Sequence, residues 1–348
     1  LRRSVEGGSR TSRMINTNYR IVAGLRGDIN ESWSYDLYGL QTESMHQRTN
    51  INNLHPQRMA NALDIVVDPV TSDWVCRSGD PGCVPWNIFQ EGGVTQEALD
   101  YISATALMDY SLETRVVNLI FTGDLEGYGL ALPSASEGIQ IAVGGEYRSE
   151  FVANRPDEVM MSGVGGSVGI QPVSAGYDVN EVFIEALVPI VQDTRGFRDF
   201  SLELGYRYSD YSTSGGSNTY KGLLNWAVTD SWRFRGGYNR AVRAPTVYEM
   251  FFPQDHYSAG RDPCANDRET GVPEASLEEC MRTGVTEEQY GNIPAIGGVN
   301  RIWGGNPLLE PEVADTVTAG LVWTPQAVPG LSVTADYYDI ELTGAIEE

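Results

Sequence analysis

The sequence lacks any long hydrophobic run. None of its apolar stretches approaches the roughly 18 residues that mark a membrane-spanning helix, and its mean hydropathy is −0.27. The sequence therefore contains no candidate for a transmembrane helix. Within a lipid core, only helices and closed β-barrels satisfy every backbone hydrogen bond. If this chain crosses a membrane, it must do so with β-strands.

Basic charge is also scarce. The chain has 24 Lys and Arg residues against 47 Asp and Glu residues, which gives a net charge of −23 and a pI near 4.4. Nucleic-acid phosphates need a basic surface, so we expect no nucleic-acid partner. Nine acidic residues lie between 255 and 288. We interpret them as the solvated face of a loop, with cation capture as the alternative.

Motifs for catalysis and metal binding are missing. The sequence has neither G-x-S-x-G nor H-E-x-x-H, and its three histidines, His46, His55 and His256, are scattered. The glycine-rich stretch 163–169 misses G-x-G-x-x-G by one position, and we interpret it as a flexible loop tip. We expect no enzyme activity, no cofactor and no metal site.

Cysteine is rare, and the four cysteines fall into two local pairs. They are Cys76 with Cys83 and Cys264 with Cys280. A structural zinc site usually needs a tighter cluster of CxxC type, so disulfides are the favoured interpretation, although four cysteines allow three pairings. Disulfides indicate an oxidising compartment such as the periplasm or the cell surface.

The chain is rich in segments in which apolar and polar residues alternate. In the segment 200–208 the apolar positions alternate with Ser201, Glu203, Gly205 and Arg207. Ten segments of this kind can be marked, and most are long enough for a tilted strand that crosses a bilayer. They cover residues 19–26, 32–42, 113–123, 138–152, 180–191, 199–211, 218–229, 231–242, 313–324 and 331–342.

The connections between these segments alternate between two kinds. Every second one is compact, whereas the others, 43–112, 153–179, 212–217 and 243–312, are long in three of four cases. Outer-membrane barrels carry short periplasmic turns and long exterior loops, so we assign the second set to the exterior. Aromatic residues near the segment ends predict interfacial girdles, although aromatics are also simply good strand formers.

Short helices are predicted inside the long connections. Ser276 with Glu279 and Thr286 with Gln289 have the spacing of capping boxes, and a helix is predicted over 96–108. The predicted fold class is all-β: a transmembrane antiparallel up-and-down β-barrel with long extracellular loops, of which these ten strands form a part. A soluble β-sandwich would have shorter strands.

Two sequence stretches resemble a known family. The first is Trp232-Arg-Phe-Arg-Gly-Gly-Tyr-Asn-Arg-Ala-Val-Arg-Ala-Pro-Thr-Val-Tyr-Glu-Met-Phe-Phe252, and the second is Gly305-Asn-Pro-Leu-Leu-Glu-Pro-Glu312. Together they resemble the TonB-dependent receptors of Gram-negative outer membranes, in which such motifs leave one strand and enter the next. Residues 144–148, 203–211 and 331–340 add supporting resemblance.

The resemblance implies a receptor and transporter in the cell outer membrane, with lipid, its own plug domain and TonB as partners. We expect residues 1–348 to be the middle of a plugged barrel of about 22 strands, with the plug, the TonB-contacting peptide and the terminal strands elsewhere. Arg233 and Arg235 share the lumen-facing side of their strand. They are expected to meet either plug carboxylates or acidic residues of neighbouring strands.

The resemblance implies uptake of a scarce ligand, but it leaves the ligand open among ferric siderophores, cobalamin, glycans and peptides. A passive porin and a surface adhesin are the alternatives. Aromatic residues and one histidine in the long loops are candidates to contact the ligand, with packing inside the loops as the competing role. These candidates are Trp74, Trp86, Tyr248, Phe251, Phe252, His256, Tyr257 and Trp303.

Overall fold

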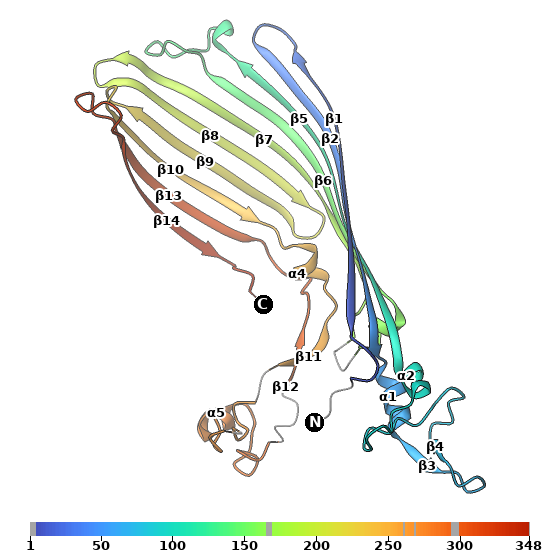
Figure 1. The fold of residues 1–348 in the computed structure, drawn as a ribbon. Helices are drawn as coiled ribbons and strands as arrows, with labels where there is room; N and C mark the ends of the chain where they lie inside the picture. The colour runs from blue at the N-terminus through green and yellow to red at the C-terminus, as the bar shows by residue number, and fades with distance from the viewer. Residues whose placement is uncertain (1–4, 165–168, 260–261, 268, 294–298, 348) are drawn as a thin grey trace.

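The computed structural model is dominated by one ten-stranded antiparallel sheet (Figure 1). It describes residues 5–164, 169–259, 262–267, 269–293 and 299–347. The strands of this sheet lie side by side in the same order in which they occur along the chain, which is the up-and-down order predicted from the sequence. The strands are β1 (Thr11–Asp28), β2 (Trp33–Leu54), β5 (Ser103–Asp124), β6 (Gln140–Pro156), β7 (Val173–Thr194), β8 (Phe197–Tyr211), β9 (Gly215–Ala227), β10 (Trp232–Arg243), β13 (Glu312–Trp323) and β14 (Val333–Thr343).

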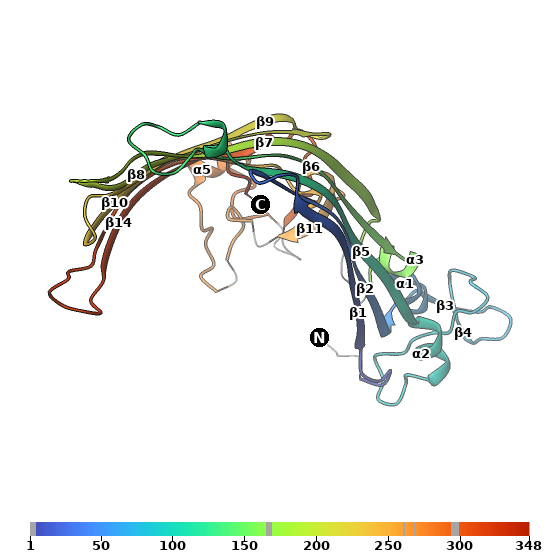
Figure 2. The same ribbon diagram turned by 90° about the horizontal axis from the view of Figure 1, so that it is seen from above.

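The sheet is curved into an open arc (Figure 2). Compact connections join the strands at one end, here called the turn end. The other end, here called the loop end, carries the connections 55–102, 157–172, 212–214 and 244–311. None of the helices in the described part of the chain has the length and hydropathy of a membrane span.

Several strands are longer than predicted. β2, β5 and β7 each have 22 residues, so residues 43–54 and 103–112 belong to strands and the first long loop covers only 55–102. Ladder pairing continues through most of these residues, from Glu43 opposite Glu113 to Leu54 opposite Ser103. The prediction missed residues 43–54 because their side chains are mostly polar on both faces, so apolar alternation does not mark them. It missed the start of β5 because residues up to 108 were predicted to continue a helix.

The first long loop folds into α1 (Pro56–Leu63), the hairpin of β3 (Ile65–Val67) and β4 (Trp74–Cys76), and α2 (Gln96–Ile102). The helix predicted over 96–108 therefore ends six residues early, because Ser103 already pairs with Leu54 in the sheet. Five residues form a small buried core: Ala62, Trp86, Ala98, Leu99 and Ile102. The predicted disulfide between Cys76 and Cys83 is confirmed.

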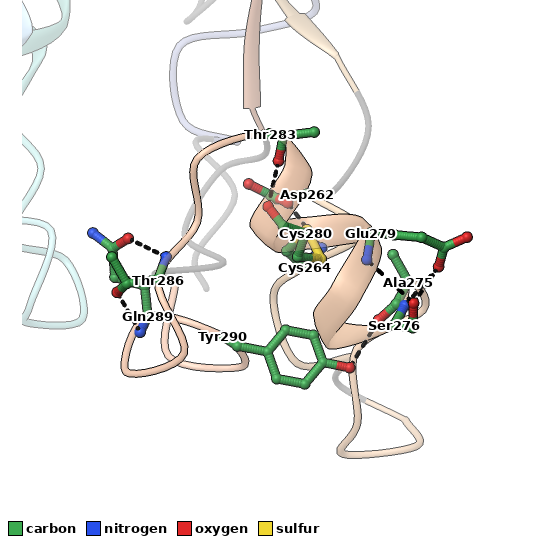
Figure 3. Close-up of a disulfide and its surroundings, with 10 residues drawn as sticks. All are labelled: Asp262, Cys264, Ala275, Ser276, Glu279, Cys280, Thr283, Thr286, Gln289 and Tyr290. Carbon is green, nitrogen blue, oxygen red and sulfur yellow. Dashed lines mark hydrogen bonds between the residues drawn. A yellow bond between two sulfur atoms is a disulfide. The ribbon is translucent and has the colours of Figure 1, made fainter.

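The second long loop contains α4 (Val247–Phe251), a hairpin of β11 (Asp255–Ala259) and β12 (Val299–Trp303), and α5 (Leu277–Arg282). Cys264 and Cys280 form the second predicted disulfide (Figure 3). The capping box of Ser276 and Glu279 starts α5 as predicted. Thr286 and Gln289 make the same reciprocal hydrogen bonds, but only a turn follows them.

The sheet is mainly polar on its inner face and mainly apolar on its outer face. Adjacent residues show the contrast: Asn118 is 5% exposed and Val117 is 52% exposed, while Glu181 is 6% exposed and Val182 is 59% exposed. A water-soluble sheet would bury the valines instead. Outward apolar residues with an inward polar face are the pattern of a barrel in lipid.

Aromatic residues form two belts on the outer face. Near the turn end, stacked and edge-on rings lie within 6.4 Å of one another between centroids. Nearer the loop end, tyrosines donate hydrogen bonds to polar side chains of the next strand, as Tyr147 does to Asp178 at 2.7 Å. Such belts are typical of the two membrane interfaces. The first belt contains Phe197, Phe200, Trp226, Trp232, Phe234 and Trp323, and the second contains Tyr19, Tyr147, Tyr206 and Tyr238.

Candidate functional site: the base of the second loop and the inner groove

Arg243 fixes the base of the second long loop. It is the last residue of β10, and its two terminal nitrogens each donate a hydrogen bond of 3.0 Å to the carboxylate of Glu249 in α4. Its Nε atom donates to Glu312, the first residue of β13. Two-point contacts between guanidinium and carboxylate groups are among the stronger hydrogen-bonded pairs in proteins. Arg243 thus holds both ends of the loop against the sheet.

The two carboxylates are themselves held by backbone groups. Glu249 Oε2 accepts a hydrogen bond of 2.7 Å from the backbone N–H of Thr246, which completes the capping box of α4. Glu312 Oε1 accepts one of the same length from the backbone N–H of Ile346, beyond β14. The bonds from Arg243 hold the pKa of the Glu249 carboxyl below its usual range.

The Gly-Asn-Pro segment closes the loop from its other side. The N–H of Gly305 donates to the carbonyl of Phe252 at 2.8 Å, and the N–H of Asn306 donates to the carbonyl of Glu249 at 2.9 Å. A Cβ atom on Gly305 would lie 2.6 Å from the carbonyl carbon of Met250. Only glycine permits this approach. We call Arg243, Glu249, Gly305, Asn306 and Glu312 the loop clamp.

The loop clamp places α4 over the inner face of the sheet. Val247 is 4% exposed and Met250 is 3% exposed, and α4 contacts β6 and β7, which lie on the far side of β8 and β9 from β10. The chain after β10 therefore crosses part of the concave face at the loop end.

Three predicted ligand contacts come together beside the clamp. The rings of Tyr248 and Phe252 are 4.4 Å apart between centroids, and the ring of Trp303 is 5.0 Å from Phe252 and 6.2 Å from Tyr248. A pocket of about 260 Å³ adjoins them and is also lined by Asn306 and Leu309. This is the one place in the described residues where several of the candidates meet.

The other candidates with described side chains make no ring contact with this cluster. Phe251 is half-buried in α4, Trp86 is buried in the core of the first loop, and Trp74 is 62% exposed in the β3–β4 hairpin. The side chains of His256 and Tyr257 lie outside the described residues. Trp86 therefore packs inside its loop, which is the competing role.

The inner face carries a larger groove at the loop end that the sequence analysis did not identify. Its volume is about 780 Å³, and β6 to β10 and the turn before α4 line it. Tyr177 and Tyr211 lie half-buried on its wall, 5.9 Å apart between ring centroids, beside Arg148. Alternation could have identified Tyr211, because it lies on the same side of its strand as Arg207. Tyr177 lies in a segment predicted to be loop.

The two predicted lumen arginines line a second groove of about 760 Å³ toward the turn end. Arg235 donates two hydrogen bonds to Asp336 of β14, at 2.9 and 2.7 Å, and reaches over Gly320 to do so. Of the two expectations for this residue, the structure shows the bridge to an acidic residue of another strand, with β13 lying between the two strands. Arg233 has no ion-pair partner among the described residues, so contact with a plug stays a prediction for it. In the same residues no group of three or more His, Cys, Asp or Glu could hold a metal ion.

Comparisons with known proteins identify the family. The family model "TonB dependent receptor-like, beta-barrel" matches residues 3–348. No curated protein sequence matches. Among solved structures, a mutant of the ferric enterobactin receptor PfeA of Pseudomonas aeruginosa is 14% identical, with a TM-score of 0.48. The siderophore receptor PirA of Acinetobacter baumannii is also 14% identical, with a TM-score of 0.47.

Each of these two matches covers 95% of this chain and 35% of the receptor. The chain therefore spans about a third of the length of the receptors that it resembles. The two sequence stretches that resemble this family, 232–252 and 305–312, contain the residues of the loop clamp. The chain belongs to the TonB-dependent receptor family, within its β-barrel domain.

Proposed function

We propose that this chain forms part of the wall and the exterior loops of a receptor in the outer membrane of a Gram-negative bacterium, which imports a scarce ligand with energy from TonB. The observation that carries the proposal is the clamped second loop. Its α4 lies across the inner face, and its aromatic cluster borders a pocket at the loop end. A structured cover at the barrel mouth suits capture of a ligand better than free diffusion.

The proposed partners follow from the same role. The outer aromatic belts would contact membrane lipid. The inner face would contact a plug domain, with Arg233 as one contact, and TonB would act on that plug. The loop end would face the exterior and receive a small-molecule, glycan or peptide ligand. We propose no catalytic role for any residue.

Growth measurements test the proposal in the native bacterium. We expect deletion of the full-length receptor gene and deletion of tonB to cause the same loss of growth on a limiting nutrient, chosen from a panel of carbon sources and iron chelates. Restoring the wild-type receptor should restore growth only in cells that have TonB. Growth that needs the receptor but not TonB would contradict energised uptake and favour a passive porin.

Conductance measurements in a planar bilayer also distinguish energised uptake from a passive porin. The purified full-length receptor should remain closed to ions, because a plug would occupy the lumen. Steady conductance by the intact protein would favour the porin. Binding of a macromolecule without any growth phenotype on the nutrient panel would favour the adhesin.

A further inference from the structure

The cations that line the large inner groove at the loop end are already paired. Every Lys and Arg that lines it lies within 4.0 Å of a carboxylate. Arg207 is 2.9 Å from Glu181, and Lys221 is 2.6 Å from Glu203 and 3.2 Å from Glu185. Arg240 and Arg243 are paired in the same way, and Arg148 Nε lies 3.4 Å from the carboxylate of Glu150. A highly anionic ligand would have to displace these carboxylates or lie beside them.

The paired charges still offer hydrogen-bonding capacity. A guanidinium group has five N–H donors and a carboxylate has about four acceptor positions, and one ion pair uses only some of them. Glu181 already accepts from both Arg207 and Ser209, at 2.9 and 2.7 Å, which fixes its position. Thr219 and Asn239 add neutral donors and acceptors to the wall. Such a surface suits a neutral ligand with many hydroxyl groups.

The aromatic part of the groove suits the same kind of ligand. Tyr177 and Tyr211 project from adjacent strands on the inner face, and their rings are inclined at 57°. A tyrosine combines an apolar ring face with a polar hydroxyl. A sugar ring combines an apolar face of C–H groups with a rim of hydroxyls, so the two surfaces match.

We propose that this groove binds a neutral saccharide, with Tyr177 and Tyr211 as the stacking surface and Arg207, Thr219 and Asn239 as hydrogen-bonding groups. The inference rests on the proposed receptor function and names the ligand class for it. The groove volume of about 780 Å³ falls within the usual range for small-ligand sites, which is roughly 300 to 1,000 Å³. It would hold a saccharide of a few residues.

Calorimetry on the purified full-length receptor tests the ligand class. The probes are neutral trisaccharides of glucose, xylose and N-acetylglucosamine, with trigalacturonate and a ferric tris-catecholate as anionic comparisons. We expect at least one neutral trisaccharide to bind at least tenfold more tightly than either anion. If either anion binds more tightly than every neutral trisaccharide, or if no neutral trisaccharide binds, the saccharide assignment is overturned.

Two tyrosine variants test the location. Tyr211→Ala should weaken saccharide binding at least tenfold and Tyr211→Phe by less, because the phenyl ring keeps the stacking surface. Tyr208→Ala is the matched control, since Tyr208 lies on the same strand but faces outward, and it should change affinity less than twofold. Equal affinities in the wild type and Tyr211→Ala would overturn the site.

The ligand class and the transport function can fail separately. Growth that needs both the receptor and TonB, together with no neutral saccharide bound, rejects the ligand class and leaves the transport function intact. Saccharide binding that is lost in Tyr211→Ala, together with growth independent of TonB, supports the site and rejects energised uptake.

Discussion

The two long loops at the loop end of the sheet are stabilised in different ways. Residues 55–102 enclose an apolar core of their own, and three of its members, Ala62, Ala98 and Ile102, have no exposed surface. Residues 244–311 are attached to the sheet through the loop clamp, which consists of ion pairs and backbone hydrogen bonds. Burial of apolar surface is not weakened by protonation or by ionic screening, whereas ion pairs are weakened by both.

This difference bears on the roles of the loops. A loop with its own core keeps its shape wherever the rest of the barrel moves. A loop held by polar contacts at its base can be released as a unit when those contacts break. The aromatic cluster of Tyr248, Phe252 and Trp303 belongs to the second loop, and so does α4. The loop that covers the inner face is therefore the one with the polar attachment.

Removal of core volume from the first loop should have the largest effect. Ile102→Ala should destabilise this loop by about 2–5 kcal/mol, because the side chain is fully buried. Hydrogen exchange of the full-length receptor should then speed up over residues 55–102 and stay unchanged over 244–311. Phe89→Ala, at a side chain that is 91% exposed, is the control. Equal exchange in both variants would show that the apolar core does not hold the loop.

The two disulfides should differ in importance. Cys264 and Cys280 are separated by 16 residues and Cys76 and Cys83 by 7. Loop-closure entropy alone gives about 3 kcal/mol for the first and about 2.5 kcal/mol for the second. The loop 55–102, which contains Cys76 and Cys83, is also supported by its apolar core. Replacing Cys264 and Cys280 by serine should therefore increase proteolysis of 244–311 more than replacing Cys76 and Cys83 increases proteolysis of 55–102. The reverse order would contradict the comparison.

Loss of the clamp arginine should loosen the second loop alone. Arg243→Met keeps an unbranched, flexible side chain but removes the guanidinium group, which leaves Glu249 and Glu312 without their partner. We expect about 1–2 kcal/mol of local destabilisation, a range that allows for solvent screening at the partly exposed guanidinium. Spin labels in α4 and in β6 should report a broader distance distribution.

Arg198→Gln is the matched control for this variant. Arg198 also pairs with two carboxylates, those of Asp193 and Asp230, but it lies at the turn end and is 58% exposed. It should leave the distance distribution unchanged. Broadening by both variants would mean that the effect comes from net charge and not from the clamp.

Lowering the pH should have the smallest effect, and this effect should be a loss of stability in the second loop. The pKa of the Glu249 carboxyl is lowered in the folded state, mainly by Arg243. Its contribution to stability is therefore complete above the ordinary carboxyl pKa of 4.5 and is lost as the pH falls through the lower folded value. Proteolysis of 244–311 by an acid-active protease should rise below about pH 4. Glu249→Gln should be less dependent on pH over this range.

Much of the fold followed from local sequence. Alternation identified ten strands, their order along the chain and the side of the sheet on which Glu203 and Arg207 lie. The cysteine spacing predicted both disulfides, and the motifs around Arg243 and Gly305 pointed to the family. These features are local because a strand repeats every two residues and because the cysteines of each pair are close in the chain.

The tertiary structure decided which distant residues meet. Arg235 and Asp336 are 101 residues apart and come together only through the register of β10, β13 and β14. Tyr248 meets Trp303 only because the clamp closes the loop, and Tyr177 faces Tyr211 only because β7 extends past its apolar segment. Side-chain neighbours across strands depend on register and loop closure, which no local pattern of residues encodes.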